Sequence, residues 1–566
     1  MTKIKKIDFC CYYFIYYIIL MNIYDYLDNL PSNTTIIDVS YKNLNIIPDL
    51  SKFADLEILI CNNNKLCNLP KINNLIKLTT LKCNNNNLQT LPELNKNLKI
   101  LFCDNNILEN LPVLPNTLTN LDCNTNNLSL LPELKNTNLK SLCANYNKLT
   151  SIPQLNNNLE IIYCDHNKLS SIPELNDNLL QLFCDHNQIL ILPQLNEKLE
   201  ILYCNNNILS SLPKLNTNLQ VLFCDTNQID IMPILNYNLQ VLNCNNNQIS
   251  KLPLLNDNLD SLYCKNTNIK CLPKLNNNLK ILNCSNNNLS RLPVLNTNLR
   301  ILYCNNNNLS TLPKLNTNLY KLYCSNNQLD TLPKLNTNLK KLKCNKNNLS
   351  NLPELNEKLE VLYCNNNKLE SLPMINKKLK ELLCSNNKLS NLPDLNNNLK
   401  ILHCNGNQIS YLPSLNSNLI ELNCSYNKLS TLPKLHNNLE ILYCINNNIS
   451  ILPQMPDYLQ ILYCYLNPIY NIISNNNNVL QNNIYEMKDK IDILNNFRLM
   501  YYVLKYKKQF IKWYWKSQEE KIKNKYSPDN LLLLLNDNQL DELNIDDLNN
   551  DKLNSNDKLE EILNAW

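Results

Sequence analysis

The chain has 566 residues, a net charge of +5 and a single glycine, Gly406. Phosphate-binding loops, dinucleotide-binding turns and nucleophile elbows each need several glycines, so one glycine excludes these three kinds of enzyme site. The small net charge gives no general argument for nucleic acid. We therefore predict that the chain is not an enzyme, and we expect neither a cofactor nor a nucleic-acid partner.

One frame of about 20 residues recurs through most of the chain: L-P-x-L-N-x-N-L-x-x-L-x-C-x-x-N-x-L, as in residues 312–331. Self-similarity at this period is typical of a leucine-rich repeat solenoid, because each unit is too small to bury its own apolar side and must stack on its neighbours. We predict an α/β repeat protein. Residues 36–470 are predicted to form a solenoid of about 22 units, with a parallel concave sheet and an extended convex side.

The segment at 1–21 carries three early lysines followed by an apolar run. The run is about 13 residues long, shorter than the roughly 20 that a membrane-spanning helix needs, and no small-residue cleavage site follows it. Three interpretations stay open: a signal or membrane anchor, an apolar cap, or a stretch upstream of a start at Met21. Residues 22–35 are predicted to form an N-terminal cap with a short helix at 24–30.

Twenty of the 25 cysteines fall in one column of the repeat: Cys61, Cys83, Cys103 and Cys123, then every twentieth residue from Cys164 to Cys464. We predict that this column faces the core, where a small, soft apolar side chain packs. Neighbouring parallel strands lie about 4.8 Å apart and hold these thiols side by side, so disulfides would need distortion. A reducing compartment fits better, and we expect a cytoplasmic protein.

A second column, three residues after the cysteine, contains asparagine: Asn64, Asn106, Asn227, Asn307 and Asn467 represent it. We predict that these buried amides serve the backbone N–H and C=O groups left free where each strand turns away. Lys42 and Thr267 interrupt the column, and we expect the loosest turns there.

Aromatic residues recur directly before the cysteine: Phe102, Tyr163, Phe183, Tyr203, Phe223, Tyr263, Tyr303, Tyr323, Tyr363, Tyr443 and Tyr463. Because side chains alternate along a strand, this position faces away from the core and predicts an exposed aromatic stripe on the concave face. Tyrosine is a favoured interface anchor, so the stripe is the predicted protein-binding site. The alternative is that stacked rings only stabilise the sheet.

His166 and His186 occupy one column in successive units, and each follows an aspartate, Asp165 or Asp185. A weak metal site is one interpretation. The spacing comes with the repeat and no third ordered ligand is evident, so we favour an acidic concave patch and predict no metal site. Cys143, displaced to the outward position, is the repeat cysteine expected to meet solvent.

Residues 111–121 (LPVLPNTLTNL) and 452–462 (LPQMPDYLQIL) resemble the 20-residue repeats of secreted effectors of enteric bacteria, the IpaH and YopM group. Elsewhere asparagine replaces the second proline, as at Asn95 or Asn316. The Asn-, Ile-, Lys- and Tyr-rich style is also similar to leucine-rich repeat proteins of amoeba-infecting giant viruses. For the repeat region, the resemblance implies a leucine-rich repeat fold and protein binding.

Some of those bacterial effectors carry a C-terminal ubiquitin ligase domain with a catalytic cysteine. Here the last cysteine, Cys464, lies inside the final repeat, so nothing after it can supply a thiolate nucleophile. The resemblance therefore does not bring a ligase activity to this chain.

Beyond the repeats, residues 471–535 are predicted to form a helical C-terminal cap. Within a helix expected at 484–525, apolar residues recur near helical spacing among lysines: Phe497, Met500, Leu504, Ile511 and Trp515. This basic amphipathic helix either covers the end of the solenoid or binds a calmodulin-like protein or an anionic membrane. Residues 536–566 are acidic and asparagine-rich, and we expect partial disorder or loose attachment to the basic helix.

We predict a cytoplasmic, non-enzymatic scaffold that binds a protein partner on its concave face, a host protein in the host cytoplasm if the chain is viral. One alternative is an adaptor that recruits a ubiquitin ligase or another partner through its C-terminal helix. The other is a structural or membrane-tethered component that uses residues 1–21. The sequence indicates no oligomeric state.

Overall fold

The computed structural model describes residues 23–474 and 484–525, apart from some side chains beyond residue 509. The chain divides into two compact units: Met1–Ile451 with Pro456–Asn471, and Leu452–Met455 with Ile472–Trp566. The apolar segment at 1–21 and the acidic tail at 536–566 lie outside the described residues. The first unit is a solenoid, and the second contains a long helix.

The solenoid carries 22 short strands in one sheet. They are β1 Ile36–Asp38, β2 Ile58–Ile60, β3 Thr80–Lys82, β4 Ile100–Phe102, β5 Asn120–Asp122, β6 Ser141–Cys143, β7 Ile161–Tyr163, β8 Gln181–Phe183, β9 Ile201–Tyr203, β10 Val221–Phe223, β11 Val241–Asn243, β12 Ser261–Tyr263, β13 Ile281–Asn283, β14 Ile301–Tyr303, β15 Lys321–Tyr323, β16 Lys341–Lys343, β17 Val361–Tyr363, β18 Glu381–Leu383, β19 Ile401–His403, β20 Glu421–Asn423, β21 Ile441–Tyr443 and β22 Ile461–Tyr463.

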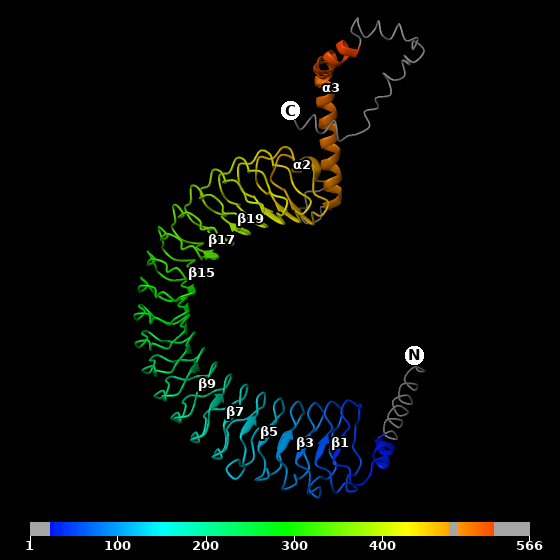
Figure 1. Cartoon of the computed structure of the whole chain (residues 1–566), viewed down its shortest axis with the longest axis vertical. Coiled ribbons are helices and arrows are strands. Elements are labelled where there is room, and N and C mark those ends of the chain that lie inside the picture. The colour runs from blue at the N-terminus through cyan, green and yellow to red at the C-terminus, as the bar shows by residue number, and fades with distance from the viewer. Residues whose placement is uncertain (1–22, 475–483, 526–566) are drawn as a thin grey trace. The chain divides into compact units, whose positions relative to one another are not determined.

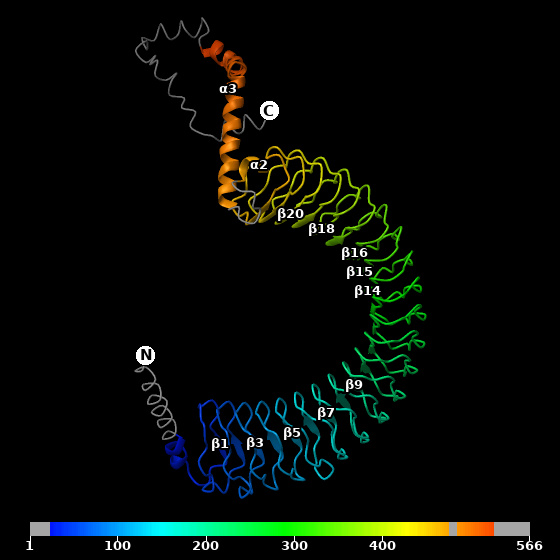
Figure 2. The same ribbon diagram turned by 180° about the vertical axis from the view of Figure 1, so that it is seen from behind.

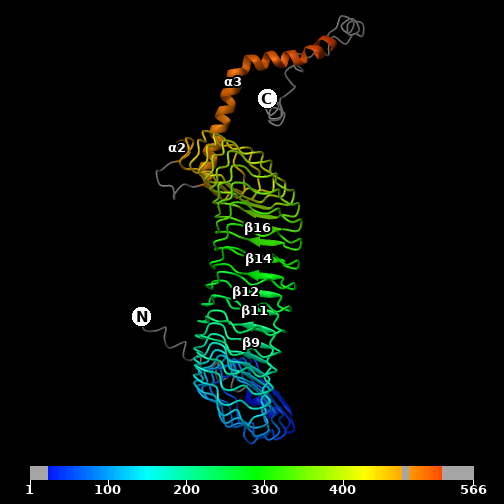
Figure 3. The ribbon, with the colours of Figure 1, turned by 90° about the vertical axis from the view of Figure 1, so that its left-hand side faces the viewer.

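Each strand pairs in parallel with the next one along the chain. Residues at the same place in successive units face each other, as Leu302 of β14 faces Leu322 of β15. Figures 1 and 2 show that the strands line the inner side of the solenoid's arc, and Figure 3 shows how the units stack. The predicted leucine-rich repeat fold with a parallel concave sheet is confirmed.

The middle residue of each strand and the following cysteine point into the core. Leu302 and Cys304 have no exposed surface, and Leu299 and Leu309 complete the same buried layer. All twenty cysteines of this column are buried, as the sequence predicts. Burying one leucine side chain stabilises the fold by about 1.5–3 kcal/mol, and every unit repeats this layer against its neighbours.

The convex side is extended, which also agrees with the prediction. Residues 39–460 are all described, and they contain no helix between the strands. The proline of each L-P-x-L segment lacks an N–H and biases the residue before it away from helical backbone. The segment is therefore too short and too restricted to build a helical layer.

The asparagines three residues after the cysteine, from Asn64 to Asn467, form the predicted ladder, and we call them the turn asparagines. The side-chain nitrogen of Asn307 donates to the carbonyls of Cys284 at 3.0 Å and of Cys304 and Asn305 at 3.2 Å. Its oxygen accepts from the N–H of Leu289 at 3.0 Å. One amide thus ties two successive units together.

Thr267 replaces a turn asparagine and preserves only part of this arrangement. Its hydroxyl lies 2.6 Å from the side-chain oxygen of Asn287 and 3.1 Å from the carbonyl of Cys264. In the described solenoid it makes no hydrogen bond to the carbonyl of Cys244 or the N–H of Ile249, the partners that an asparagine would reach in the preceding unit. The expected looseness of this turn rests on that missing connection.

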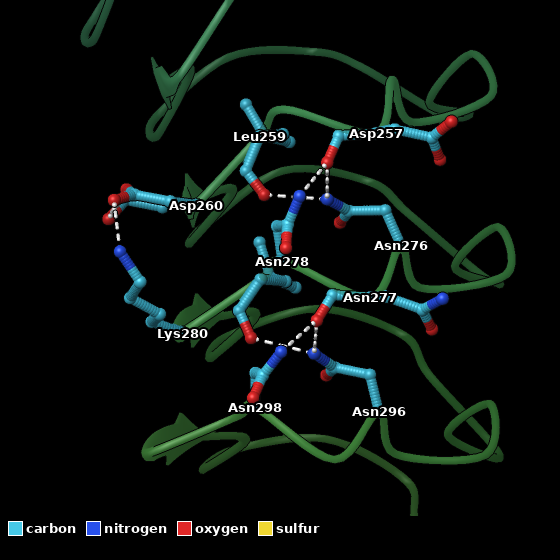
Figure 4. Close-up of polar contacts among 11 residues, drawn as sticks. Asp257, Leu259, Asp260, Asn276, Asn277, Asn278, Lys280, Asn296 and Asn298 are labelled. Atoms are coloured by element: carbon cyan, nitrogen blue, oxygen red, sulfur yellow. Dashed lines mark hydrogen bonds and ion pairs between the residues drawn. The ribbon is translucent and has the colours of Figure 1, made fainter.

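A second asparagine ladder follows the convex side and is formed by both asparagines of L-P-x-L-N-x-N. We call them the convex asparagines. The nitrogen of Asn276 donates to the carbonyl of Leu259 at 2.7 Å, and the nitrogens of Asn276 and Asn278 both donate to the carbonyl of Asp257. Figure 4 shows that the next unit repeats this arrangement. The two ladders therefore account for part of the asparagine-rich composition.

The residue two positions after the cysteine has a left-handed backbone in successive units, with φ near +50° to +58° at the non-glycine residues. Asparagine tolerates this region better than most residues, and it occupies most of the column. The single glycine of the chain, Gly406, also stands here with φ +67°. A Cβ at Gly406 would collide with the side-chain oxygen of Asn386.

Helices lie only near the ends of the described chain. Residues 23–29 are helical, close to the predicted 24–30. α2 is Tyr470–Ile473, and α3 is Ile484–Lys525, the helix that the sequence predicts. No helix among the described residues is long and apolar enough to cross a membrane.

The predicted amphipathic character of α3 is not observed in its middle. Met500 to Leu504 are five consecutive apolar or aromatic residues, and all five are exposed. Since successive residues lie about 100° apart around a helix, these five side chains surround it. Among the side chains of α3 that the structure describes, the buried apolar ones, Met487 and Ile491, lie near its start.

Candidate protein-binding face

The concave face is formed by the first and third residues of each strand, because side chains alternate along a strand. In β9, Leu202 is fully buried, whereas Ile201 and Tyr203 are half-buried on the opposite side. All eleven aromatic residues that the sequence singles out occupy the third position of their strands. Ten are half-buried by their neighbours and one, Tyr463, is 37% exposed, so the stripe is more covered than predicted.

Four of these residues, Tyr163, Phe183, Tyr203 and Phe223, form one contiguous group of rings that we call the aromatic cluster. The ring centroids are 4.6 Å apart between Tyr163 and Phe183, 4.9 Å between Phe183 and Tyr203, and 4.4 Å between Tyr203 and Phe223. These distances suit favourable aromatic pairs. The next strand has Asn243 at this position, and the cluster ends there.

The remaining aromatic residues are not continuous with the aromatic cluster. Tyr303 and Tyr323 form one pair with centroids 5.0 Å apart, and Tyr443 and Tyr463 form another at 5.5 Å. Asparagine stands on both sides of Tyr263. The structure therefore divides the predicted stripe into separate groups.

Tyr363 is held by a neighbouring carboxylate. Its hydroxyl donates to the side chain of Glu381 at 2.6 Å. Burial, together with this bond and the negative charge of Glu381, raises the pKa of Tyr363 to about 12. Tyr363 is therefore neutral and fixed in orientation at physiological pH.

Partly buried aspartates border the aromatic cluster. Asp165 accepts from the N–H of Asp185 at 2.7 Å, and Asp185 accepts from the N–H of Asn205 at 2.6 Å. Burial raises the pKa of Asp165 to about 6 and also raises the pKa of Asp185. These carboxylates bridge successive units and leave the region acidic at neutral pH.

His166 and His186 stack on each other and do not converge on a shared ligand position. Their ring centroids are 4.1 Å apart, and Tyr146 stacks on His166 at 4.2 Å. Burial, and then the neighbouring His186, lower the pKa of His166. No group of three or more His, Cys, Asp or Glu side chains within the described ranges is arranged to hold a metal ion.

A group of lysines on the concave face was not predicted from the sequence. Lys321 and Lys341 occupy the first position of β15 and β16, and Lys343 occupies the third position of β16. We call these three residues the basic cluster. The net charge of +5 does not reveal these lysines, because it sums over the whole chain. Alignment of the units by their cysteines would have shown lysines in columns that otherwise contain many apolar residues.

Solved structures provide the comparison with known proteins. YopM from Yersinia enterocolitica WA-314 is 31% identical, covers 79% of this chain and 94% of its own, and has a TM-score of 0.70. YopM from Yersinia pestis, described as a leucine-rich effector protein, is 27% identical over 76% of this chain and 92% of its own, with a TM-score of 0.33.

The Arabidopsis receptor kinase HAESA, solved with the peptide hormone IDA and the co-receptor SERK1, is 21% identical over 77% of this chain and 87% of its own. Its TM-score of 0.55 shows a shared fold. No protein-family model matches the sequence, and no match was found among curated proteins.

The stacked strands, the buried leucine and cysteine columns and the turn asparagines define a leucine-rich repeat protein. The identity to YopM extends over most of both chains. The chain therefore belongs to the YopM family of leucine-rich repeat proteins, which agrees with the resemblance noted at residues 111–121.

Proposed function

We propose that the chain is a non-enzymatic scaffold that binds a protein partner on the concave face of its solenoid. The aromatic cluster carries this proposal, because contiguous tyrosine and phenylalanine rings on a concave surface suit the anchors of a protein interface. HAESA, which shares the fold, is solved with a peptide hormone and a co-receptor, and this supports a protein-binding role.

The rings are not required to build the sheet. β11 and β13 have Asn243 and Asn283 at the same position, yet both strands pair in the same register as their neighbours. Stacking can add stability to a sheet, but here the sheet also forms without it. This comparison favours a binding role for the aromatic cluster over a purely structural one.

Cys143, the cysteine expected to meet solvent, does not have the character of a nucleophile, although Cys67 and Cys271 are the more exposed cysteines of the repeats. Cys143 is half-buried rather than fully exposed, and burial raises the pKa of its thiol to about 11. It is therefore protonated at neutral pH, whereas a nucleophilic cysteine must ionise readily. The buried column of free thiols also supports a reducing cytoplasm, which would be that of a host cell if the chain is viral.

The test compares capture from a host-cell lysate by the full chain and two variants. The double variant Phe183→Asn with Tyr203→Asn uses a residue that already stands in this column. The control, Tyr237→Thr, removes an exposed tyrosine from the convex side, where the preceding unit has Thr217.

We expect a discrete protein to be retained by the parent and the control and to be reduced at least tenfold with the double variant. A tenfold loss corresponds to about 1.4 kcal/mol, less than one strong interface anchor contributes. Circular dichroism and urea unfolding check that the double variant is folded. Identical capture by all three proteins would overturn the concave-face proposal.

A second candidate function is that of an adaptor. The exposed apolar side chains around α3, such as Phe497, Met500 and Leu504, favour it, because such surfaces often mark interaction sites. In this proposal α3 recruits a second protein, with a ubiquitin ligase as the candidate. Deletion of residues 484–566 should then remove that protein from the captured set and leave the concave-face partner bound.

A further inference from the structure

The basic cluster places like charges on adjacent strands of the sheet, where neighbouring strands carry apolar residues. Lys321 and Lys341 are direct partners across β15 and β16, whereas the strands on either side have Ile301 and Val361 in this column. Like charges opposite each other on adjacent strands destabilise a sheet. The two lysines therefore lower the stability of the sheet at this position relative to apolar residues. An anionic ligand would offset the repulsion between them.

Lys343 is positioned by two tyrosines. Its ammonium lies 5.0 Å from the ring centroid of Tyr323 and 4.3 Å from that of Tyr363. These cation–π contacts orient the side chain on the concave face without neutralising its charge. Among the described residues, no carboxylate lies within 4.0 Å of the ammonium groups of Lys321, Lys341 or Lys343.

Negative charges limit the basic cluster in both directions along the solenoid. Towards the C-terminal end, Glu360, Glu381 and Glu421 follow within a few units. Towards the N-terminal end stand Asp260 and then Asp225. A long polyanion such as a nucleic acid needs a continuous basic track and would meet these carboxylates. A short anionic segment avoids the distant carboxylates, and the two nearest are already engaged: Glu360 pairs with Lys340 and Lys380, and Glu381 accepts from Tyr363.

We propose that the basic cluster binds a short acidic segment of the partner protein, a run of Asp and Glu side chains whose carboxylates contact Lys321, Lys341 and Lys343. This inference rests on the proposed function, because it assigns a chemistry to part of the same concave face. Charge complementarity of this kind selects partners and speeds their association, and it weakens as salt rises.

The test uses the full chain and a triple variant, Lys321→Ile, Lys341→Ile and Lys343→Tyr. The replacements are residues found in the same columns of neighbouring strands, so the sheet is preserved. The control, Lys274→Gln, Lys314→Gln and Lys334→Gln, removes three exposed lysines from the convex side and changes the net charge equally.

The probe is a fluorescein-labelled ten-residue peptide with four consecutive glutamates in a Ser/Gly background, and its glutamine counterpart serves as the neutral probe. Fluorescence anisotropy should show binding of the glutamate peptide to the parent and the control. Affinity should fall at least tenfold with the triple variant, with the glutamine peptide, and between 50 and 300 mM salt.

Equal affinity of the parent and the triple variant, or of the two peptides, would overturn the proposal. So would tighter binding of a ten-nucleotide oligo(dT) that is lost with the triple variant, because that result assigns the basic cluster to single-stranded nucleic acid. Failure of the proposed function is seen separately, as lysate capture that does not change with Phe183→Asn and Tyr203→Asn.

Discussion

The two asparagine ladders use the same side chain to different extents. A turn asparagine such as Asn307 uses both ends of its amide, donating to carbonyls of two units and accepting from Leu289. In the central units, from Asn196 to Asn296, the first convex asparagine of each unit only donates, and its buried oxygen has no partner. Replacing a turn asparagine, whose amide both donates and accepts, should therefore cost more stability than replacing a convex asparagine, whose amide only donates.

Asn307→Ala should have the largest effect on stability. It leaves the buried Leu289 N–H without an acceptor, which costs about 1–3 kcal/mol. It also removes one of two donors to the Cys284 carbonyl, at about 0.5–1.5 kcal/mol because Asn287 still donates to that carbonyl, so we expect about 3 kcal/mol in total. The control Asn276→Ala in the convex ladder should cost about 1 kcal/mol. Urea unfolding measures both, and equal losses would contradict the difference between the ladders.

Thr267→Asn should stabilise the solenoid by about 1.5 kcal/mol. The new amide would supply the missing donor to the Cys244 carbonyl and the missing acceptor for the Ile249 N–H, at about 0.5–1.5 kcal/mol for each hydrogen bond. Hydrogen exchange of the peptide that contains Ile249 measures the effect locally. Protection should increase there and stay constant around Asn307, and unchanged exchange at Ile249 would show that the turn is already complete.

Asp165→Asn tests a third column, in which the side chain accepts from the backbone of the next unit. The pKa of Asp165 is raised to about 6 in the fold from an ordinary 3.8, so the folded protein binds the extra proton. This contribution is fully present below pH 3.8 and is lost as the pH rises through about 6.

Asparagine keeps the acceptor for the Asp185 N–H without the charge. The variant should therefore be more stable than the parent by about 1 kcal/mol at pH 7.5, allowing for solvent screening of a half-buried carboxyl group, and the difference should vanish near pH 4. Urea unfolding at both pH values measures it. A difference that does not depend on pH would contradict the assignment.

Asn296→Pro should have the smallest effect, within about 0.5 kcal/mol. Proline loses two donated hydrogen bonds but restricts the unfolded chain, and these contributions nearly cancel. The unit with Pro115 shows how the repeat tolerates proline, because the hydroxyl of Thr117 bonds to the carbonyls of Lys96 and Leu98 instead. A loss as large as that expected for Asn307→Ala would show that the convex amide is as necessary as the turn amide.

The fold could be predicted because the residues that determine it recur with a period of about 20 residues. The inward columns and the turn asparagines follow from the period, whereas the limits of a strand such as β1 Ile36–Asp38 do not. Strand limits depend on hydrogen bonds between units, and the side-chain pattern does not encode them. The helix at 484–525 was predictable from its spacing, but which of its side chains are buried was not.

The candidate site was only partly predictable. The aromatic positions follow from strand alternation, whereas the division into groups depends on which neighbours carry Asn243 and Asn283. The role of the convex asparagines depends on which carbonyls the preceding unit presents. The recurrence of N-x-N in successive units was the available signal, and its hydrogen-bonding geometry could not be read from it.

The turn asparagines also determine how the molecule can change in size. Every unit offers its neighbour the same carbonyl and N–H groups, so removal or duplication of one whole repeat between Asn167 and Asn467 leaves two ends that still match. The number of repeats between two points on the concave face then sets the distance between them. The spacing between the aromatic cluster and the basic cluster is counted in whole units of about 4.8 Å, so a change in the number of repeats would adjust it to a new binding partner while the pattern of the turn asparagines is kept.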